Sequence, residues 1–503
     1  MTRASPRRAA LLLAPVVIGA TLAVVTPIRG DAQEVVAGEW IAGDLHVHTT
    51  YSHDSYGGPT DDNTGPDEAH TLGYPVAGQF ALAATRGLDY LAITDHNDVR
   101  SVSDPGFGAA GVIPVPGYEN SLRGHAQMLG AIRLYDNGDR SADAVERIAD
   151  ELRADGGVFQ VNHPADGSTD FPNDSDWEYL YEVVPDTVEV WNISRLYQPP
   201  GPSGSSNDDA VRYWEGWLDR GHRVGATGGS DSHWVSTSAV QGVGQPTTWV
   251  FVTERSAAGV LEGLRAGRTF ITHQPPNYRG PRVFLEADAE GDGEFESMVG
   301  DAVPPGSTLR VRIEGAPGSF VRVVTTGSQE AFAPVPVVSA SFTHEFTQPE
   351  GTTWARAEIF EPDARAERSS LCDDELGSET TYCRNHLLIL AMTSAIYFQP
   401  ESIATALDYV GDERGLGETV HLAARLTTLA GEPVVGRTVA FEIAEQMLFA
   451  TTDVTGLAEA TASVPDHGRS LEVRAVFAGD DVYLPSEDFA TITWGGGPPP
   501  RAA

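Results

Sequence analysis

The stretch Asp44-Leu-His-Val-His-Thr-Thr-Tyr-Ser-His-Asp54 carries three histidines and follows an apolar segment that is typical of a β-strand. His46 and His48 are two residues apart in an extended segment, so their side chains point to the same side and can share one ion. Imidazole and carboxylate ligands without cysteine favour zinc, manganese or iron over calcium, which prefers oxygen ligands. The stretch therefore indicates a metal site at the end of a strand.

Similar clusters recur further along the first half of the chain, each at the end of an apolar, β-prone run. They are Thr94-Asp-His96, Glu119 with His125, Asn162-His-Pro164 and Ser230-Asp-Ser-His233. Ligands from the ends of successive parallel strands meet at one mouth of a barrel, so we expect these clusters to converge there. A single histidine is usually an ordinary surface or hydrogen-bonded residue, but seven of the fourteen lie in the opening stretch and these four clusters, which favours a metal site.

The blocks DLHVHTTYSHD, ITDHN, GYEN with GHAQMLG, VNHP and GGSDSH, taken in this order, resemble the PHP (polymerase and histidinol phosphatase) superfamily of metal-dependent hydrolases. The residues within these motifs are most similar to those of the CehA/McbA-like branch, which includes carbamate-ester hydrolases. The likeness spans residues 40–275. It implies an α/β fold with a distorted (β/α)7 barrel, and a site that holds two or three divalent transition metal ions.

The resemblance also implies which residues bind the metals. The implied ligands are His46, His48, Glu119 and Asp231 for a first ion, His53, His96 and His233 for a second, and His125 and His163 with Glu119 as a bridge for a third. The position of His53 is often an aspartate in the superfamily, and Asp54 follows directly. Either residue could be the ligand, and we predict His53.

Asp95 and Arg123 are the residues that we predict to support catalysis beside the ligands. Asp95, like Asp44, precedes a ligand motif and is expected to orient an imidazole, with a plain turn aspartate as the alternative. Arg123 lies between two ligands and could bind an anionic oxygen through both of its terminal nitrogens, with a solvated loop arginine as the alternative. Weaker candidates for substrate or pocket contacts are Asn97, Asn192, Arg195 and Trp234.

The predicted chemistry follows from the metals. Adjacent divalent ions lower the pKa of a bound water and polarise the oxygen of the bond under attack, so we predict a phosphoesterase that uses a metal-activated hydroxide. The same hydroxide can attack a carbonyl, which makes carboxylic or carbamate ester hydrolysis the alternative. A catalytically inert cell-surface binding scaffold is a third possibility. The chain contains no lysine, which excludes a Schiff-base lysine and a phosphate-loop lysine.

Residues 1–32 have the features of a secretory signal peptide: arginines, then a long apolar run, then the small-residue segment Gly30-Asp-Ala32. We predict a secreted, periplasmic or cell-surface protein, with an uncleaved membrane anchor as the alternative because the apolar run is slightly long. Cys372 and Cys383 are expected to form a disulfide after export. The net charge of −38 argues against binding to nucleic acid. The expected partners are a small-molecule ester substrate and a surface or matrix contact made through the β domains.

The sequence divides into several parts. In residues 38–278, strand-like runs such as YLAIT and TVEVW alternate with helical patterns that stop at Gly156-Gly157, Gly221 and Gly267. Residues 280–400 show period-2 runs typical of a β-sandwich, such as Leu309, Val311 and Ile313. Residues 403–496 resemble bacterial immunoglobulin-like domains through EPVVGRTVAFEI, DVTGLAEAT and FAGDDVYLPS, and 497–503 form a flexible tail. A chain ending near residue 278 should therefore contain every ligand.

Overall fold

A computed structural model of the chain describes residues 37–52, 74–164, 177–192, 207–233, 242–362, 387–399, 403–415, 418–444, 446–464, 470–480 and 482–494. By internal contacts the chain separates into Met1–Val36 and Ala37–Ala503, and all described residues belong to the second unit. The predicted signal peptide, His53, Arg195, Trp234, the two cysteines and the tail lie outside the described residues. Within the described ranges, no helix combines the length and the apolar character needed to cross a membrane.

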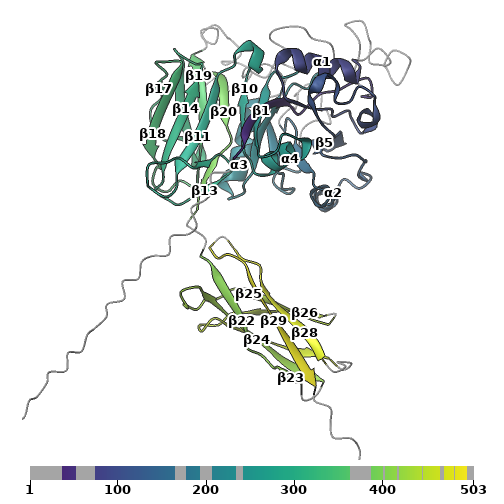
Figure 1. Cartoon of the computed structure of the whole chain (residues 1–503), viewed down its shortest axis with the longest axis vertical. Coiled ribbons are helices and arrows are strands. Elements are labelled where there is room, and N and C mark those ends of the chain that lie inside the picture. The colour runs from purple at the N-terminus through teal and green to yellow at the C-terminus, as the bar shows by residue number, and fades with distance from the viewer. Residues whose placement is uncertain are drawn as a thin grey trace, which may run out of the picture. The chain divides into compact units, whose positions relative to one another are not determined.

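The first region contains parts of two sheets (Figure 1). Five neighbouring strands of the larger sheet belong to it: β3 (Ile113–Val115), β2 (Tyr90–Ala92), β1 (Glu39–Asp44), β9 (Thr247–Val252) and β10 (Thr269–Thr272). The order of the smaller sheet is β4 (Glu119–Leu122), β5 (Gly124–Leu129), β6 (Val158–Val161), β7 (Thr187–Asn192) and β8 (Gly225–Gly229). Strands β1, β2 and β3 are parallel, as are β6, β7 and β8, whereas β4, β5 and β9 pair antiparallel with their neighbours.

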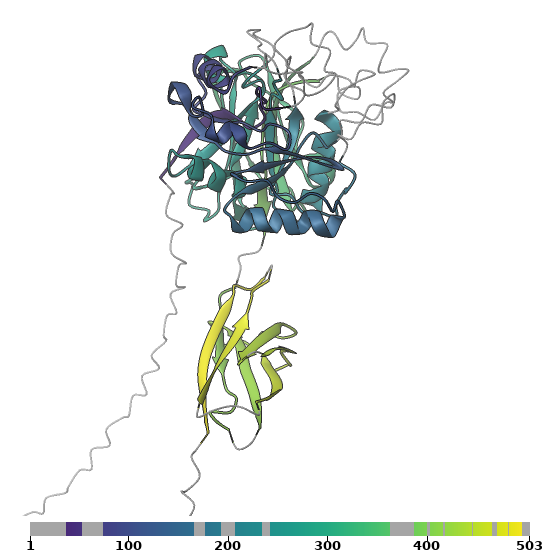
Figure 2. The same ribbon diagram turned by 90° about the vertical axis from the view of Figure 1, so that its right-hand side faces the viewer.

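Four helices lie around the outside of these strands (Figure 2). They are α1 (Val76–Arg86), α2 (Ala142–Ala154), α3 (Asn207–Asp219) and α4 (Ala257–Arg265). Helix α2 begins where the hydroxyl of Ser141 accepts a hydrogen bond from the backbone of Ala144, and it buries Val145, Ile148, Ala149 and Leu152 on one face. Helices α2, α3 and α4 each end two residues before the glycine that the sequence marks as a stop.

The two sheets meet close to the residues that the sequence predicts as metal ligands. Parallel bridges join Val47 to Ser232 and His96 to Glu119, so the end of β1 lies beside the end of β8, and the end of β2 beside the start of β4. The regular alternation of a (β/α)7 barrel is not what the described residues show, since they contain four helices and an antiparallel β5. A single residue separates β4 from β5, and a parallel connection would need a dozen or more.

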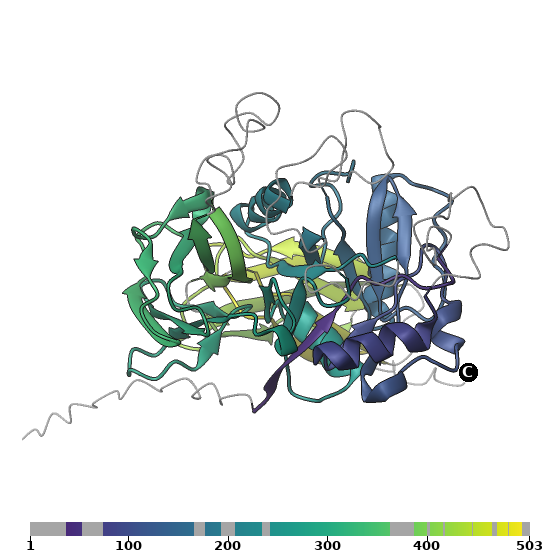
Figure 3. The same cartoon turned by 90° about the horizontal axis from the view of Figure 1, so that it is seen from above.

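The second region consists of strands in two layers, and in Figure 3 they lie on the side away from α1. One layer is β12 (Ser297–Met298), β11 (Arg282–Asp288), β14 (Thr308–Glu314) and β18 (Ser341–Thr347). The other comprises β13 (Ala302–Val303), β21 (Ile396–Phe398), β19 (Trp354–Pro362), β20 (Leu387–Thr393), β15 (Phe320–Thr325), β16 (Gln329–Glu330) and β17 (Val335–Pro336). Leu309, Val311 and Ile313 are buried between the layers, as their alternation predicts. Strand β20 pairs with β10, so the larger sheet continues from the first region into the second.

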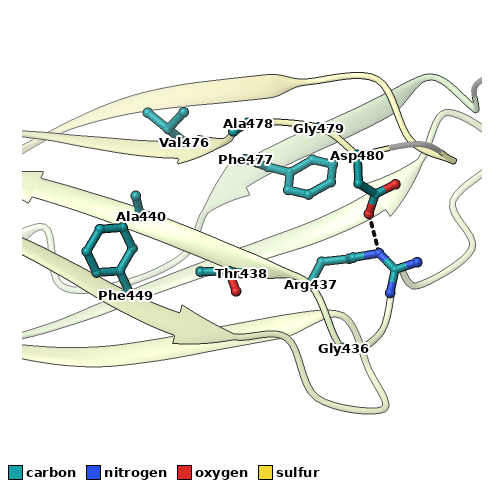
Figure 4. A pocket seen from close by; sticks show the side chains of 10 residues that line it. All are labelled: Gly436, Arg437, Thr438, Ala440, Phe449, Val476, Phe477, Ala478, Gly479 and Asp480. Carbon is teal, nitrogen blue, oxygen red and sulfur yellow. Dashed lines mark ion pairs between the residues drawn. The ribbon is translucent and has the colours of Figure 1, made fainter. Parts of the chain in front are cut away.

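The C-terminal region is all-β and has its own core, which includes Val420, Leu422, Val439 and Phe441. One of its sheets is β22 (Thr405–Tyr409), β24 (Thr419–Thr428) and β27 (Leu457–Ser463). The other is β23 (Arg414–Gly415), β29 (Ser486–Trp494), β28 (Ser470–Phe477), β25 (Thr438–Ile443) and β26 (Gln446–Thr451). Figure 4 shows a groove on this second sheet, with Phe449 on one strand and the ion pair of Arg437 and Asp480 at one end.

Candidate metal centre

Eight of the nine predicted ligands lie in one cluster at the ends of the strands; His53 is outside the described residues. They are His46 and His48 after β1, His96 after β2, Glu119 in β4, His125 in β5, His163 after β6, and Asp231 and His233 after β8. Four of the eight are buried, the other four are partly buried, and Glu119 contacts five of the histidines. The sheets therefore bring together residues that are spread over nearly two hundred positions.

Five of the six separations among four predicted ligand atoms match the spacing of a tetrahedral metal site. Nε2 of His46 lies 3.1 Å from Nε2 of His48, 3.2 Å from Oε2 of Glu119 and 3.2 Å from Oδ1 of Asp231. Nε2 of His48 lies 3.4 Å from the same glutamate oxygen and 3.1 Å from the same aspartate oxygen. A tetrahedron with bonds of about 2.0–2.1 Å has edges of about 3.3 Å, so these four atoms can all bind one ion such as zinc.

Glu119 divides its two oxygens between different groups of histidines. Oε2 faces His46 and His48, and it also lies 3.3 Å from Nε2 of His96. Oε1 lies 3.2 Å from Nδ1 of His125 and 3.3 Å from Nε2 of His163. A carboxylate whose oxygens face separate donor groups is suited to bridging two ions, and further donor atoms of His48, His96 and His233 gather close to one another.

The protonation state of His46 fits a cation bound between His46, His48, Glu119 and Asp231. Its Nδ1 lies 3.0 Å from Oε1 of Glu189, so Nδ1 carries the hydrogen in the neutral ring and donates it to that carboxylate. The Nε2 lone pair then faces the carboxylates of Glu119 and Asp231, which are also acceptors. Such a set of acceptors holds together only with a positive charge among them, and a divalent ion or an imidazolium proton would supply it.

The electrostatics of the cluster favour ionised carboxylates. Burial acts to raise the pKa of Glu119, but the imidazoles of His46, His96 and His125 outweigh it and hold the pKa well below its usual range. Burial likewise acts to raise the pKa of Asp231, and the imidazoles of His46 and His233 lower it well below the ordinary value. Both carboxylates are therefore ionised, as a ligand to a cation must be.

Asp95 and Asp44 support the backbone of the ligand loops. Asp95 accepts hydrogen bonds from the backbone of Thr49 at 2.6 Å and from its hydroxyl at 2.9 Å, while burial raises the pKa of Asp95 to about 6. Asp44 accepts from the backbone of His46 at 3.1 Å, of Ser230 at 3.1 Å and of Gly244 at 2.6 Å. The sequence predicts that both orient imidazoles, whereas Asp95 accepts hydrogen bonds from Thr49, and Asp44 accepts them from backbone amides.

The predicted substrate contacts have different placements. Arg123 is exposed, and its guanidinium lies 4.0 Å from the carboxylate of Glu178, at the edge of ion-pair range. Within the described residues, Arg123 makes no hydrogen bond or ion pair with a predicted ligand of the cluster. Asn192 reaches the cluster, where its Nδ2 lies 3.3 Å from Oδ2 of Asp231. Asn97 has a left-handed backbone and binds the hydroxyl of Ser121 at 3.0 Å.

Two ligands have an unusual backbone conformation. Asp231 has a φ of 48° and His163 a φ of 24°, both in the region that favours glycine. Strain of this kind persists only where the surroundings hold the residue, and it concentrates at functional sites. The amide of Asp231 donates to the carbonyl of His46 at 2.9 Å, which ties the two ligand loops together.

Several residues of the site were not predicted from the sequence. Glu189 binds His46, Asn162 donates to Oε1 of Glu119 at 2.8 Å, and the hydroxyl of Ser52 lies 3.0 Å from Nδ1 of His48. One feature of the sequence could have identified Glu189: it is a charged residue within an otherwise strand-like segment, β7, whose residues are all buried. Fully buried glutamates are rare unless they are paired.

No protein-family model matches the chain, and no curated protein matches it in sequence. Among solved structures, it is similar to a two-domain protein from Bacteroides vulgatus with a predicted PHP-like metal-dependent phosphoesterase (TM-score 0.35, 16% identity, 64% of this chain and 90% of that one). It is also similar to a candidate metal-dependent phosphoesterase from Bifidobacterium adolescentis (TM-score 0.26, 14% identity, 40% of this chain and 90% of that one). A third similar structure contains fibronectin(III)-like modules of Clostridium thermocellum CbhA (TM-score 0.20, 10% identity, 42% of this chain and 93% of that one). Scores this low carry no argument about this chain.

Proposed function

We propose that the chain is a metal-dependent hydrolase and that the His46, His48, Glu119 and Asp231 group is the centre of its active site. The observation that carries this proposal is the set of five separations of 3.1–3.4 Å among these four predicted ligand atoms. Hydrogen bonds from protonated imidazoles satisfy only some of these separations, because each Nε2 carries at most one hydrogen. The motif resemblance to the PHP superfamily independently supports the same assignment.

Phosphoester hydrolysis is the reaction that this arrangement supports best. Divalent ions, when bound, supply a water of lowered pKa and neutralise charge on the ester oxygens. Glu119 presents one oxygen to each of two histidine groups, so it would serve as a shared ligand of two ions, which is the arrangement used in two-metal displacement at phosphorus. Asn162 and Ser52 fix the orientation of Glu119 and His48, so the ligand set is preorganised.

Carbamate or carboxylic ester hydrolysis is the second candidate, because the wording of the sequence motifs is most similar to the CehA/McbA-like branch. The third, an inert binding scaffold, conflicts with the completeness of the described ligand set. In keeping with the features of residues 1–32, we propose that the protein acts outside the cytoplasm on a small-molecule ester.

The proposal is tested by metal analysis and turnover on the same purified full-length chain. The metal content per chain is measured by plasma mass spectrometry after loading with Zn²⁺ or Mn²⁺. Hydrolysis is then measured on chromogenic phosphomonoester, phosphodiester, acetate ester and carbamate substrates. We expect two or three ions per chain and the fastest turnover on a phosphoester. Fastest turnover on the carbamate would favour the second candidate, and a chain that binds no metal would overturn the proposal.

A further inference from the structure

Glu189 is a fully buried carboxylate that contacts ligand loops from different parts of the chain. It lies in β7, and its Oε1 accepts a hydrogen bond from Nδ1 of His46 at 3.0 Å. Its Oε2 accepts from the backbone amide of His163 at 3.1 Å and from Nδ2 of Asn192 at 3.0 Å. Asn192 in turn reaches Asp231. Glu189 is thus connected to the loops that follow β1, β6 and β8.

We propose that Glu189 is a positioning residue that sets the tautomer of His46 and the backbone of His163, so that both imidazoles present the correct nitrogen to the metals. This inference rests on the proposed metal centre. The carboxylate can only accept hydrogen bonds, so the His46 nitrogen facing it must be the protonated one. Nε2 is then left as the lone pair that faces Glu119, His48 and Asp231.

The contact with His163 accounts for the strained backbone at that ligand. His163 has a φ of 24°, and its amide points at Oε2 of Glu189. A hydrogen bond from a buried amide to a charged carboxylate is stronger than a neutral one, so it can hold an unfavourable φ. Nε2 of His163 remains directed at Oε1 of Glu119, 3.3 Å away.

The neighbouring strand makes room for Glu189. A Cβ atom at Gly229 in β8 would collide with Oε1 of Glu189 and with Cβ of His46. Gly229 is not among the residues with a positive φ, so its backbone conformation does not require glycine. The missing side chain serves the contact between the carboxylate and the imidazole.

Glu189→Gln provides the sharpest test because the side chain keeps its shape. The amide oxygen can still accept from His163 and Asn192, while the amide nitrogen donates to Nδ1 of His46 and forces the hydrogen onto Nε2. We expect the apparent affinity for Zn²⁺ to fall about 10–100-fold, the range for carboxylates that orient metal ligands. Full metal content should return at high Zn²⁺. Gly229→Ala should weaken Zn²⁺ binding in the same direction with the carboxylate still present.

The tautomer is read directly by ¹⁵N NMR of histidine-labelled, metal-free protein, at a pH high enough for the His46 ring to be neutral. We expect Nδ1–H at His46 in the unsubstituted chain and Nε2–H in Glu189→Gln. The matched control is Glu182→Gln, an exposed carboxylate seven residues earlier, which should leave both the tautomer and the Zn²⁺ affinity unchanged.

Two results would overturn the inference. One is an unchanged tautomer with unchanged Zn²⁺ affinity in Glu189→Gln. The other is the loss of one whole ion at every Zn²⁺ concentration, which would make Glu189 a ligand. Failure of the proposed function is distinct from both, because the unsubstituted chain would then bind no metal while its His46 tautomer could still be measured.

Discussion

Nε of Arg356 in β19 donates a hydrogen bond to Oε1 of Glu215 in α3 at 2.8 Å, and both side chains are almost fully buried. This pair joins the second region to a helix of the first. Arg356 also pairs with Glu358, which in turn accepts from Arg322 at 2.6 Å. Nearby, the indole of Trp354 donates to Asp219 at 2.8 Å. The two regions therefore share a buried polar interface as well as the sheet that runs from β10 to β20.

Replacing Arg356 with methionine should strongly destabilise the protein. The substitution leaves Glu215 buried without its arginine, with only the hydroxyl of Ser328 as a partner, and removes one of the two arginines at Glu358. We expect the free energy of unfolding to fall by about 3–5 kcal/mol, as when one member of a buried ion pair is removed. Urea denaturation measures it. Arg133→Met, which removes an exposed pair with Asp155, should change the value by about 1 kcal/mol or less. Equal effects would contradict a structural role for the buried network.

The same network predicts an acid dependence of stability. Burial acts to raise the pKa of Glu358, but Arg322 and Arg356 outweigh it and lower the pKa to about 2. Because the pKa is lower in the folded state, the ionised carboxylate stabilises the fold at pH values above its unfolded pKa of about 4.3. That contribution is lost as the pH falls from about 5 towards 2. In Glu358→Gln this part of the Tm decrease should be missing from thermal unfolding curves.

Truncation at residue 278 should be more damaging than truncation at residue 400. A chain ending at 278 contains every predicted ligand, but β10 loses its pairing with β20, and Glu215 loses Arg356. A chain ending at 400 keeps both contacts. We expect the longer chain to be soluble, with the metal content of the full chain, and the shorter to have a lower Tm or to aggregate. Equal Tm values and metal contents would show that the second region is dispensable for the first.

Glu119→Gln should remove more than one metal ion per chain. The amide has only one acceptor oxygen, so it cannot serve both histidine groups that the carboxylate faces. We expect mass spectrometry to show a loss of more than one equivalent, with turnover abolished on every substrate. His421→Ala, an exposed histidine in the C-terminal region, is the control and should retain full metal. Full metal and activity in Glu119→Gln would refute its bridging role.

Mutation can show whether His53 or Asp54 binds the second predicted ion together with His96 and His233. We predict that His53→Ala selectively weakens the ion near His96 and His233, with the His46, His48, Glu119 and Asp231 group still occupied. Loss of a direct ligand should exceed the roughly 10–100-fold effect of an outer contact. Anomalous scattering from crystals of each variant locates the ions that remain. Full occupancy in His53→Ala together with a lost ion in Asp54→Ala would identify the aspartate as the ligand.

Local patterns in the sequence predict much of the scaffold. The apolar face of α2 and the alternation of Leu309, Val311 and Ile313 are visible without any structure, because periods of 3.6 and 2 are properties of the local backbone. The regular seven β/α units implied by the resemblance are not seen in the described residues. The link between β4 and β5 is too short for a helix, whereas the superfamily resemblance implies a helix between successive strands.

By itself, the sequence determined the residue types of the candidate metal centre and the pairing of His46 with His48, since both depend on local spacing. It also placed six of the predicted ligands after strands, whereas Glu119 and His125 lie within β4 and β5. Only the tertiary structure decided which atoms face one another. It placed Glu119 between two groups of histidines and brought Glu189 against His46. The same tertiary contacts turned Asp95 towards Thr49. Such contacts join residues far apart in the chain, and they depend on how the strands pair and twist, which the spacing of residues along the chain does not encode.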